Sequence, residues 1–270
     1  MKNKRTIWLK QGFQWTFLIV LATLNNNLSA QTSEPNTDAA FIRKIYDQAL
    51  TDGRCYPWLK DLCLEVGHRL SGSPGAEKAV LWSKAALDTL GLDSVWLQPV
   101  LVPHWERGAA EQVSATGKSG KLQLQALALG GSVGTGGKAV SAPVIEIKSW
   151  DQLDLLNERG IRGKIVFYNR PMEPTHLRTF EAYGEAVDQR VHGASRAAKY
   201  GAVAVLVRSM GFRIDDFPHT GSLRYDSTYT LIPAAAISTQ AAEQLSALIR
   251  TDGKVTVSVT LNCQTLPDVL

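Results

Sequence analysis

The sequence predicts an α/β protein in two parts, a helical N-terminal part followed by a β-rich α+β part. Apolar residues recur at helical spacing over residues 38–90, whereas from Ser94 the pattern changes to short extended runs. Further along, the runs 164–167 and 202–207 are short, β-branched and apolar, and a helical pattern that ends at Gly201 lies between them. A strand, a helix and a strand in this order form a βαβ-like unit, which indicates the α/β class.

The first thirty residues have the order of an export signal. Basic residues at positions 2–10 precede an apolar run over 15–24, and small residues then offer a cleavage site between Ala30 and Gln31. Ten apolar residues are too few to span a bilayer core of roughly 30 Å, so cleavage is favoured over the alternative of an uncleaved anchor. We therefore expect a secreted or periplasmic protein that meets the membrane only during export, with residues 31–37 as a polar leader.

The charge of the chain argues against nucleic acid as a partner. The 270 residues include 29 basic and 25 acidic side chains, a net charge of +4. Four of the basic residues and none of the acidic ones lie in residues 1–30, so the remainder is neutral, and it has no basic run longer than two. Because nucleic-acid binding requires clustered lysine and arginine, we expect no nucleic-acid partner.

Three helices are expected before Gly91. The first follows an apolar face over residues 38–50, and the second is a short apolar stripe over 58–66. Ser73 followed by Pro74 is typical of a helix start, because serine caps the free N–H groups and proline fits the first turn. The third helix then runs to Gly91. These helices have no sheet of their own to cover, so we assign them to part of a larger domain.

The β-rich part is expected to contain short strands separated by turns with glycine, proline or charged residues. Strands are predicted over residues 95–102, 111–116, 122–129, 140–147, 164–167, 202–207, 231–237 and 254–262. Helices are predicted over residues 150–158, 194–200 and 239–249. Residues 217–230 are expected to form an irregular loop.

Motifs for phosphate binding and for serine catalysis are incomplete. Gly134, Gly136 and Ala139 match a dinucleotide-binding pattern, but a strand rather than a helix is expected to follow, so we interpret the segment as a flexible turn. Ser73 lies in the segment SGSPG, which lacks the first glycine of a nucleophile elbow, and the proline after it removes an oxyanion N–H. Neither motif predicts an active site.

The sequence contains no recognisable pattern of metal ligands either. The five histidines are isolated, with no H-E-x-x-H or H-x-D pattern, whereas a catalytic zinc site needs about three protein ligands. Cys55, Cys63 and Cys263 are an odd number for an oxidising compartment. Cys55 and Cys63 are expected about two helical turns apart, which favours buried free thiols, with a disulfide as the alternative. We predict no catalytic and no metal-binding residue in this chain.

Seven segments, taken together and in order, resemble one family of enzymes. They are GHRLSGSPG (67–75), PVLVPHWERG (99–108), GGSVGT (130–135), GIRGKIVFYNRP (160–171), GASRAAKYGAVAVLVRS (193–209), PHTGSLRY (218–225) and IPAAAIS (232–238). The family is that of secreted di-zinc exopeptidases with an inserted protease-associated domain, and the carboxypeptidase Q group is the most similar. The resemblance covers about residues 55–250.

The resemblance implies a divided peptidase domain. Residues 38–109 resemble the incomplete N-terminal piece of a zinc-exopeptidase α/β domain, residues 110–250 the inserted β-rich α+β protease-associated domain, and residues 251–270 the start of the return to the peptidase domain. In the family, the ligands of two zinc ions and the catalytic glutamate follow a strand like 254–262. The resemblance therefore implies that this chain alone binds no zinc and is inactive. It also implies a peptide substrate and allows a homodimer.

Two functions stay open at this point. The first is the N-terminal portion of a secreted zinc-dependent exopeptidase acting on small peptides, with the protease-associated domain shaping substrate access. The second is a non-catalytic secreted module that binds peptides or a partner protein. In either case the loop 218–225 is the expected contact surface, with His219, Thr220 and Tyr225 as candidate contact residues. An ordinary surface loop is the alternative.

Overall fold

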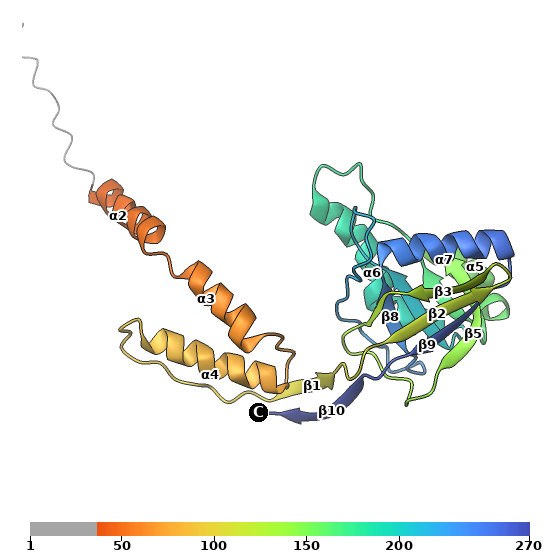
Figure 1. Ribbon diagram of the computed structural model, residues 1–270, viewed down its shortest axis with the longest axis horizontal. Helices are drawn as coiled ribbons and strands as arrows, with labels where there is room; N and C mark the ends of the chain where they lie inside the picture. The colour runs from red at the N-terminus through yellow and green to blue at the C-terminus, as the bar shows by residue number, and fades with distance from the viewer. Residues whose placement is uncertain (1–36) are drawn as a thin grey trace, which may run out of the picture. The chain divides into compact units, whose positions relative to one another are not determined.

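A computed structural model describes residues 37–270 of the chain, which divide into two compact units with the division after Asp61. The predicted export signal, its cleavage site at Ala30 and Gln31, and most of the polar leader lie outside the described residues. The first unit contains α2 (Thr37–Thr51) and α3 (Cys55–Asp61), shown in Figure 1. Within residues 37–270, no helix is both long enough and apolar enough to cross a membrane.

The second unit, residues 62–270, begins with two helical elements. A π-helical turn, η1 (Leu62–Val66), is followed by α4 (Pro74–Asp88). The predicted start of the third helix is confirmed, because the Ser73 hydroxyl accepts a hydrogen bond of 3.2 Å from the Ala76 backbone N–H and Pro74 occupies the first turn. The stripe predicted over 58–66 is divided between α3 and η1.

An eight-stranded sheet forms the body of the second unit, in the order β3-β2-β9-β5-β6-β7-β8-β4. Its strands are β2 (Gln112–Gly117), β3 (Gly120–Leu124), β4 (Ala126–Ala128), β5 (Val140–Ile147), β6 (Ile165–Tyr168), β7 (Ala204–Arg208), β8 (Ala234–Ile237) and β9 (Thr256–Thr260). The run β5 to β8 is parallel, and the other pairings are antiparallel. Each of these strands overlaps a predicted one.

The single strand predicted over residues 122–129 is wrong, because the structure has two strands there. β3 and β4 lie at opposite ends of the strand order, yet only Gln125 separates them in the chain. The sheet must therefore curl until its two edges are one residue apart. The Gln125 carbonyl accepts a hydrogen bond of 3.0 Å from the Ser238 N–H just after β8, so this residue joins the two edges.

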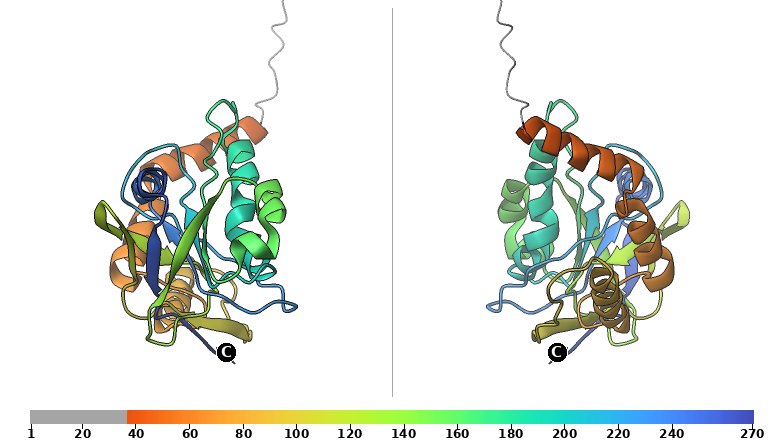
Figure 2. Two further views of the ribbon diagram at one scale, coloured as in Figure 1. Left: turned by 90° about the vertical axis from the view of Figure 1, so that its right-hand side faces the viewer. Right: turned by 90° about the vertical axis from the view of Figure 1, so that its left-hand side faces the viewer.

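Helices cover both faces of the sheet (Figure 2). α7 (Thr239–Asp252) packs on one face, while α5 (Trp150–Ile161) and α6 (Thr179–Ala198) pack on the other. The side chains of β6 alternate between them, since Ile165 and Phe167 face α7 whereas Val166 and Tyr168 face α5 and α6. All four are buried, as expected for a strand covered on both sides.

α6 is much longer than the helix predicted over 194–200. Its core-facing positions are mostly alanine and glycine, which gives a weak apolar signal. Gly193 allows the helix to lie directly on Tyr168, because a Cβ at this position would come within 2.7 Å of the tyrosine ring. The Tyr168 hydroxyl also donates a 3.0 Å hydrogen bond to the Gly193 carbonyl. Close contact with the sheet, rather than side-chain hydrophobicity, therefore holds α6.

Two further strands connect the sheet to the rest of the unit. The strand predicted over 95–102 is wrong in position, because β1 is Val102–Glu106 and residues 95–101 form no strand. β1 pairs antiparallel with β10 (Gln264–Val269), which the sequence did not predict. The segment QTLPDV contains proline and polar residues, so its extended form depends on pairing with β1. The chain thus leads into and out of the sheet along two adjacent strands.

Candidate functional site

The predicted contact residues His219, Thr220 and Tyr225 are each bonded to backbone groups of the same domain. His219 Nδ1 donates to the Met210 carbonyl at 2.8 Å, and the Thr220 hydroxyl donates to the Ala128 carbonyl at 2.8 Å. The Tyr225 hydroxyl donates to the Ile232 carbonyl at 2.6 Å and accepts from the Val133 N–H at 3.2 Å. These bonds fix the loop 218–225 against the sheet.

The surroundings of Tyr225 and His219 differ. Burial raises the pKa of the Tyr225 hydroxyl, so that it stays protonated and keeps its role as a donor. His219 is exposed, and its ring lies beside that of Tyr183 with the ring centroids 6.0 Å apart. The structure therefore gives Tyr225 an anchoring function, while the outer edge of His219 remains accessible. A role of these residues in binding stays a prediction.

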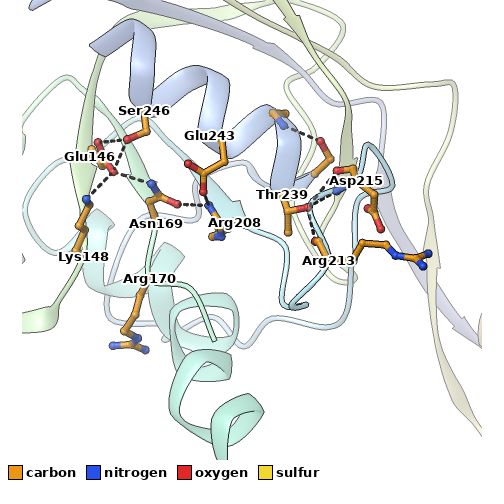
Figure 3. Close-up of polar contacts among 12 residues, drawn as sticks. Glu146, Lys148, Asn169, Arg170, Arg208, Arg213, Asp215, Thr239, Glu243 and Ser246 are labelled. Carbon is orange, nitrogen blue, oxygen red and sulfur yellow. Dashed lines mark hydrogen bonds and ion pairs between the residues drawn. The ribbon is translucent and has the colours of Figure 1, made fainter. Parts of the chain in front are cut away.

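A polar network occupies the carboxyl ends of the parallel strands, beneath α7 (Figure 3). Glu146 of β5 accepts hydrogen bonds from Asn169, which follows β6, at 2.6 Å and from Ser246 of α7 at 3.0 Å. Arg208 at the end of β7 donates to Asn169 at 3.1 Å and to Glu243 of α7 at 2.7 Å. The network thus joins three strands to one helix.

The charges of this network are nearly balanced within it. The Arg208 side chain is only 6% exposed and is paired with Glu243, and Lys148 Nζ lies 3.5 Å from the Glu146 carboxylate. Buried charges of this kind are stable only when paired and hydrogen-bonded. The Ser246 hydroxyl donates to the Glu146 carboxylate, so the arrangement fixes the strand ends and orients α7.

Sequence reasoning missed this network, although a signal for it was present. A polar residue stands at or just after the end of each apolar run, in PVIEIK, IVFYNR and AVLVRS. The carboxyl ends of parallel strands meet at one edge of a sheet, where functional residues often gather. Glu146, Asn169 and Arg208 come together only because β5, β6 and β7 are adjacent in the sheet.

Histidines pair with carboxylates in two places without forming a metal site. His104 lies 3.3 Å from Glu106, and His176 lies 2.9 Å from Glu185. The hydrogen bond to Glu185 raises the pKa of His176. Across residues 37–270, no group of three or more His, Cys, Asp or Glu side chains is arranged to hold a metal ion. The described residues therefore supply no set of zinc ligands.

The predicted burial of Cys55 and Cys63 is wrong, because both thiols are free and exposed. Cys55 lies in α3 and Cys63 in η1, and neither of these short helical segments has a buried residue. Cys263 is free and buried, its thiol lies 3.3 Å from the Ser132 carbonyl, and burial raises its pKa. A buried thiol with a raised pKa is typical of a structural cysteine.

The glycine-rich segment near Gly134 forms a turn, as the sequence predicted. Gly136 and Gly137 have φ of 64° and 75°, a left-handed conformation that favours glycine. The strand β5 follows it rather than a helix. A helix N-terminus that could bind a phosphate group is thus missing at this point.

Comparisons with known proteins identify relatives of most of the chain. No family model matches the sequence. Carboxypeptidase Q of Xenopus laevis is 38% identical over 229 residues, which are 84% of this chain and 46% of that protein, and carboxypeptidase Q of Homo sapiens is 36% identical over 224 residues, 83% of this chain and 45% of that protein. A crystal structure of a peptidase M28 precursor from Shewanella amazonensis SB2B superposes with a TM-score of 0.78 at 33% identity, covering 84% of this chain and 50% of that chain.

The chain therefore spans a little under half the length of these carboxypeptidase Q relatives. The fold expected from the resemblance is confirmed by the structural match, since helices and a sheet-rich domain of this kind occur in a peptidase M28 precursor. Over most of its length this chain is similar to part of the carboxypeptidase Q family, as its seven sequence segments predicted.

Proposed function

We propose that this chain is part of a secreted zinc-dependent exopeptidase that acts on small peptides. The observation that supports this most directly is the 38% identity to a carboxypeptidase Q over 84% of the chain. The matched structure of a peptidase M28 precursor supports the same class of enzyme. In this proposal the eight-stranded sheet, together with α5, α6 and α7, forms the protease-associated domain. This part of the chain, called the sheet unit below, shapes the access of peptides to the active site.

The pairing of β1 with β10 supports an inserted domain. An insertion into another domain is tolerated best where its two ends lie close together. Val102 lies opposite Val269 and Glu106 opposite Gln264, so the chain leads into and out of the sheet at the same place. Because β9 lies between β2 and β5, residues 256–260 belong to the same sheet. We therefore place the inserted domain at about residues 107–262, rather than at the 110–250 expected from the sequence.

The zinc ligands are proposed to come from a polypeptide segment other than residues 37–270. In this proposal that segment supplies two zinc ions with their ligands and the glutamate that activates water. It also completes the domain to which α2, α3 and α4 belong. The exposed apolar side chains of these helices support this, because Phe41 of α2 is 65% and Val80 of α4 is 49% exposed.

The experiment compares residues 31–270 with a longer chimera in which the second half of a carboxypeptidase Q relative follows Leu270. Zinc content and dipeptide hydrolysis are measured on both after their folding has been checked by circular dichroism. We expect the shorter chain to hold no stoichiometric zinc and to hydrolyse no dipeptide. The chimera is expected to hold two zinc ions per chain and to lose its activity on treatment with a chelator.

Two outcomes would contradict the proposal. Tight zinc binding with turnover by residues 31–270 would mean that His68, His104 or His219 belongs to a metal site. A folded chimera that takes up no zinc, beside a short chain that binds peptides, would instead favour the non-catalytic secreted binding module.

A further inference from the structure

A cleft of about 640 Å³ opens on the side of the sheet unit, away from the polar network beneath α7. One wall is the C-terminal half of α6, with Arg196 in its last turn and Lys199 as its C-cap residue. The opposite wall is the segment 224–229, which follows the loop of the predicted contact residues. The volume of the cleft lies in the range of small-ligand sites, roughly 300–1,000 Å³.

The cationic groups of this cleft form no ion pair with the described carboxylates. Among residues 37–270, Arg196, Lys199 and Arg224 form no ion pair, although all three line the cleft. The two carboxylates in the lining each accept a hydrogen bond. Asp154 accepts a hydrogen bond of 2.8 Å from the Tyr200 hydroxyl, and Asp226 accepts one of 2.9 Å from the Thr228 N–H. The cleft thus has three cations that form no ion pair among residues 37–270, and Lys199 interacts with the Tyr200 side chain.

Aromatic rings hold two of these cations, Arg196 and Lys199. The Arg196 guanidinium lies 4.2 Å from the centre of the Trp150 ring, and Lys199 Nζ lies 5.0 Å from that of Tyr200. Such contacts with aromatic faces hold a cation in place without neutralising it. The backbone of the opposite wall is also fixed, because the Arg224 backbone N–H donates to the Val191 carbonyl at 2.9 Å and the Asp226 backbone N–H donates to the Ser195 hydroxyl at 2.8 Å.

The remaining lining of the cleft is aromatic. Tyr225 and Tyr229 contribute to its wall beside Arg224. Since the Tyr225 hydroxyl is turned to the Ile232 carbonyl, its ring rather than its hydroxyl is left for a ligand. A site that combines fixed cations with aromatic rings suits a ligand that carries both anionic groups and apolar surface.

We propose that this cleft binds acidic peptides, with side-chain or terminal carboxylates on Arg196, Lys199 and Arg224 and an apolar side chain against Tyr225 and Tyr229. Carboxylate is favoured over phosphate because the cleft lies at the C-terminal end of α6, where the partial charge of the helix is negative. That end disfavours a dianion more than a single negative charge. The site lies wholly in the sheet unit and does not depend on zinc.

The test measures the binding of a fluorescein-labelled peptide, Glu-Glu-Phe-Glu, to the purified chain by fluorescence polarisation. The peptide Gln-Gln-Phe-Gln is the matched neutral probe. Arg224→Gln should weaken the binding of the acidic peptide roughly tenfold, as expected for the loss of one charge-assisted hydrogen bond. Arg213→Gln is the control, because Arg213 is an exposed arginine that does not line the cleft. It should leave the affinity unchanged.

A second variant keeps the proposal open to refutation if the first has a small effect. Arg224→Glu should bind the acidic peptide even more weakly than Arg224→Gln, with an unchanged melting temperature because this side chain is exposed. Equal binding of the acidic and neutral peptides, no binding of either at millimolar concentration, or tighter competition by inorganic phosphate than by the acidic peptide would each overturn the proposal. The proposed exopeptidase function would be untouched by any of these results.

Discussion

Asp252 at the end of α7 accepts two hydrogen bonds from Ser119 in the turn between β2 and β3. The Ser119 N–H lies 2.8 Å from one carboxylate oxygen, and the Ser119 hydroxyl lies 2.5 Å from the other. Gly117 makes this approach possible, because a Cβ there would come within 2.1 Å of the Asp252 carboxylate. One side chain therefore fixes the end of the helix to the edge hairpin of the sheet.

This contact predicts a specific dependence of stability on pH. The hydrogen bonds from Ser119 hold the pKa of Asp252 below its ordinary value. A lowered pKa contributes stability that is complete above the unfolded-state pKa of about 4 and is lost as the pH falls through the folded-state pKa. Asp252→Asn should therefore lower the melting temperature at pH 7, and the difference from the unchanged protein should shrink as the pH falls below 4. Equal losses at pH 7 and pH 3 would contradict this.

Tyr225→Phe should destabilise the sheet unit by about 1–2 kcal/mol, because it removes one donor and leaves the Val133 N–H and the Ile232 carbonyl without their partner. Urea unfolding followed by circular dichroism measures this loss. Tyr229→Phe is the matched control, since Tyr229 makes no side-chain hydrogen bond among those described and should change little. A stability loss in the control as large as that of Tyr225→Phe would argue against the anchoring role.

Substitution of one buried and one exposed phenylalanine compares the core of the sheet with the helix α2. Phe167→Ala should lower the free energy of unfolding by about 3–5 kcal/mol, since this ring is fully buried between β6 and α7 and its removal leaves a cavity. Phe41→Ala should cost far less, because Phe41 is 65% exposed. Denaturant unfolding of the two variants compares them directly. A similar loss in both would show that α2 packs against a core.

Substitution of Glu243 should lower the free energy of unfolding, because the buried Arg208 then loses its carboxylate partner. Glu243→Ala leaves the Arg208 guanidinium without a carboxylate in a buried position, and we expect a loss of about 2–3 kcal/mol. Glu185→Ala is the control, because that side chain is 62% exposed and pairs with the partly exposed His176. Thermal unfolding distinguishes the two, and a loss of less than 0.5 kcal/mol for Glu243→Ala, about the size of an exposed pair, would mean that Asn169 alone suffices for Arg208.

Limited proteolysis tests the boundaries of the inserted domain. A stable fragment of about residues 107–262 should resist digestion, because β9 lies in the middle of the sheet and cannot be lost without exposing its neighbours. Mass spectrometry of the fragments locates the cleavage sites. Early cleavage inside residues 160–208, or release of a stable fragment ending near residue 250, would contradict this assignment.

Local patterns in the sequence were sufficient for most of the elements. The capped helix after Ser73 follows from the fit of one serine and one proline to a helix start. The buried strands β6 and β7 follow from short β-branched runs, and the turn at Gly136 follows from residues that tolerate positive φ. In each case the deciding interactions lie within a few residues of one another in the chain.

Contacts between segments far apart in the sequence decided the remaining elements and both candidate sites. The sequence does not show which of these segments lie next to one another. β10 is extended because it pairs with β1 more than 150 residues earlier, and α6 is held by the approach of Gly193 to Tyr168. The same holds for both candidate sites. Glu146 and Arg208 share one network because β6 lies between β5 and β7, and Arg224 faces α6 because its backbone is bonded to Val191. The sequence by itself determined which segments form most of the strands and helices and which family they resemble. Only the tertiary structure decided which charged side chains meet, since strand order and helix packing set the distances between them.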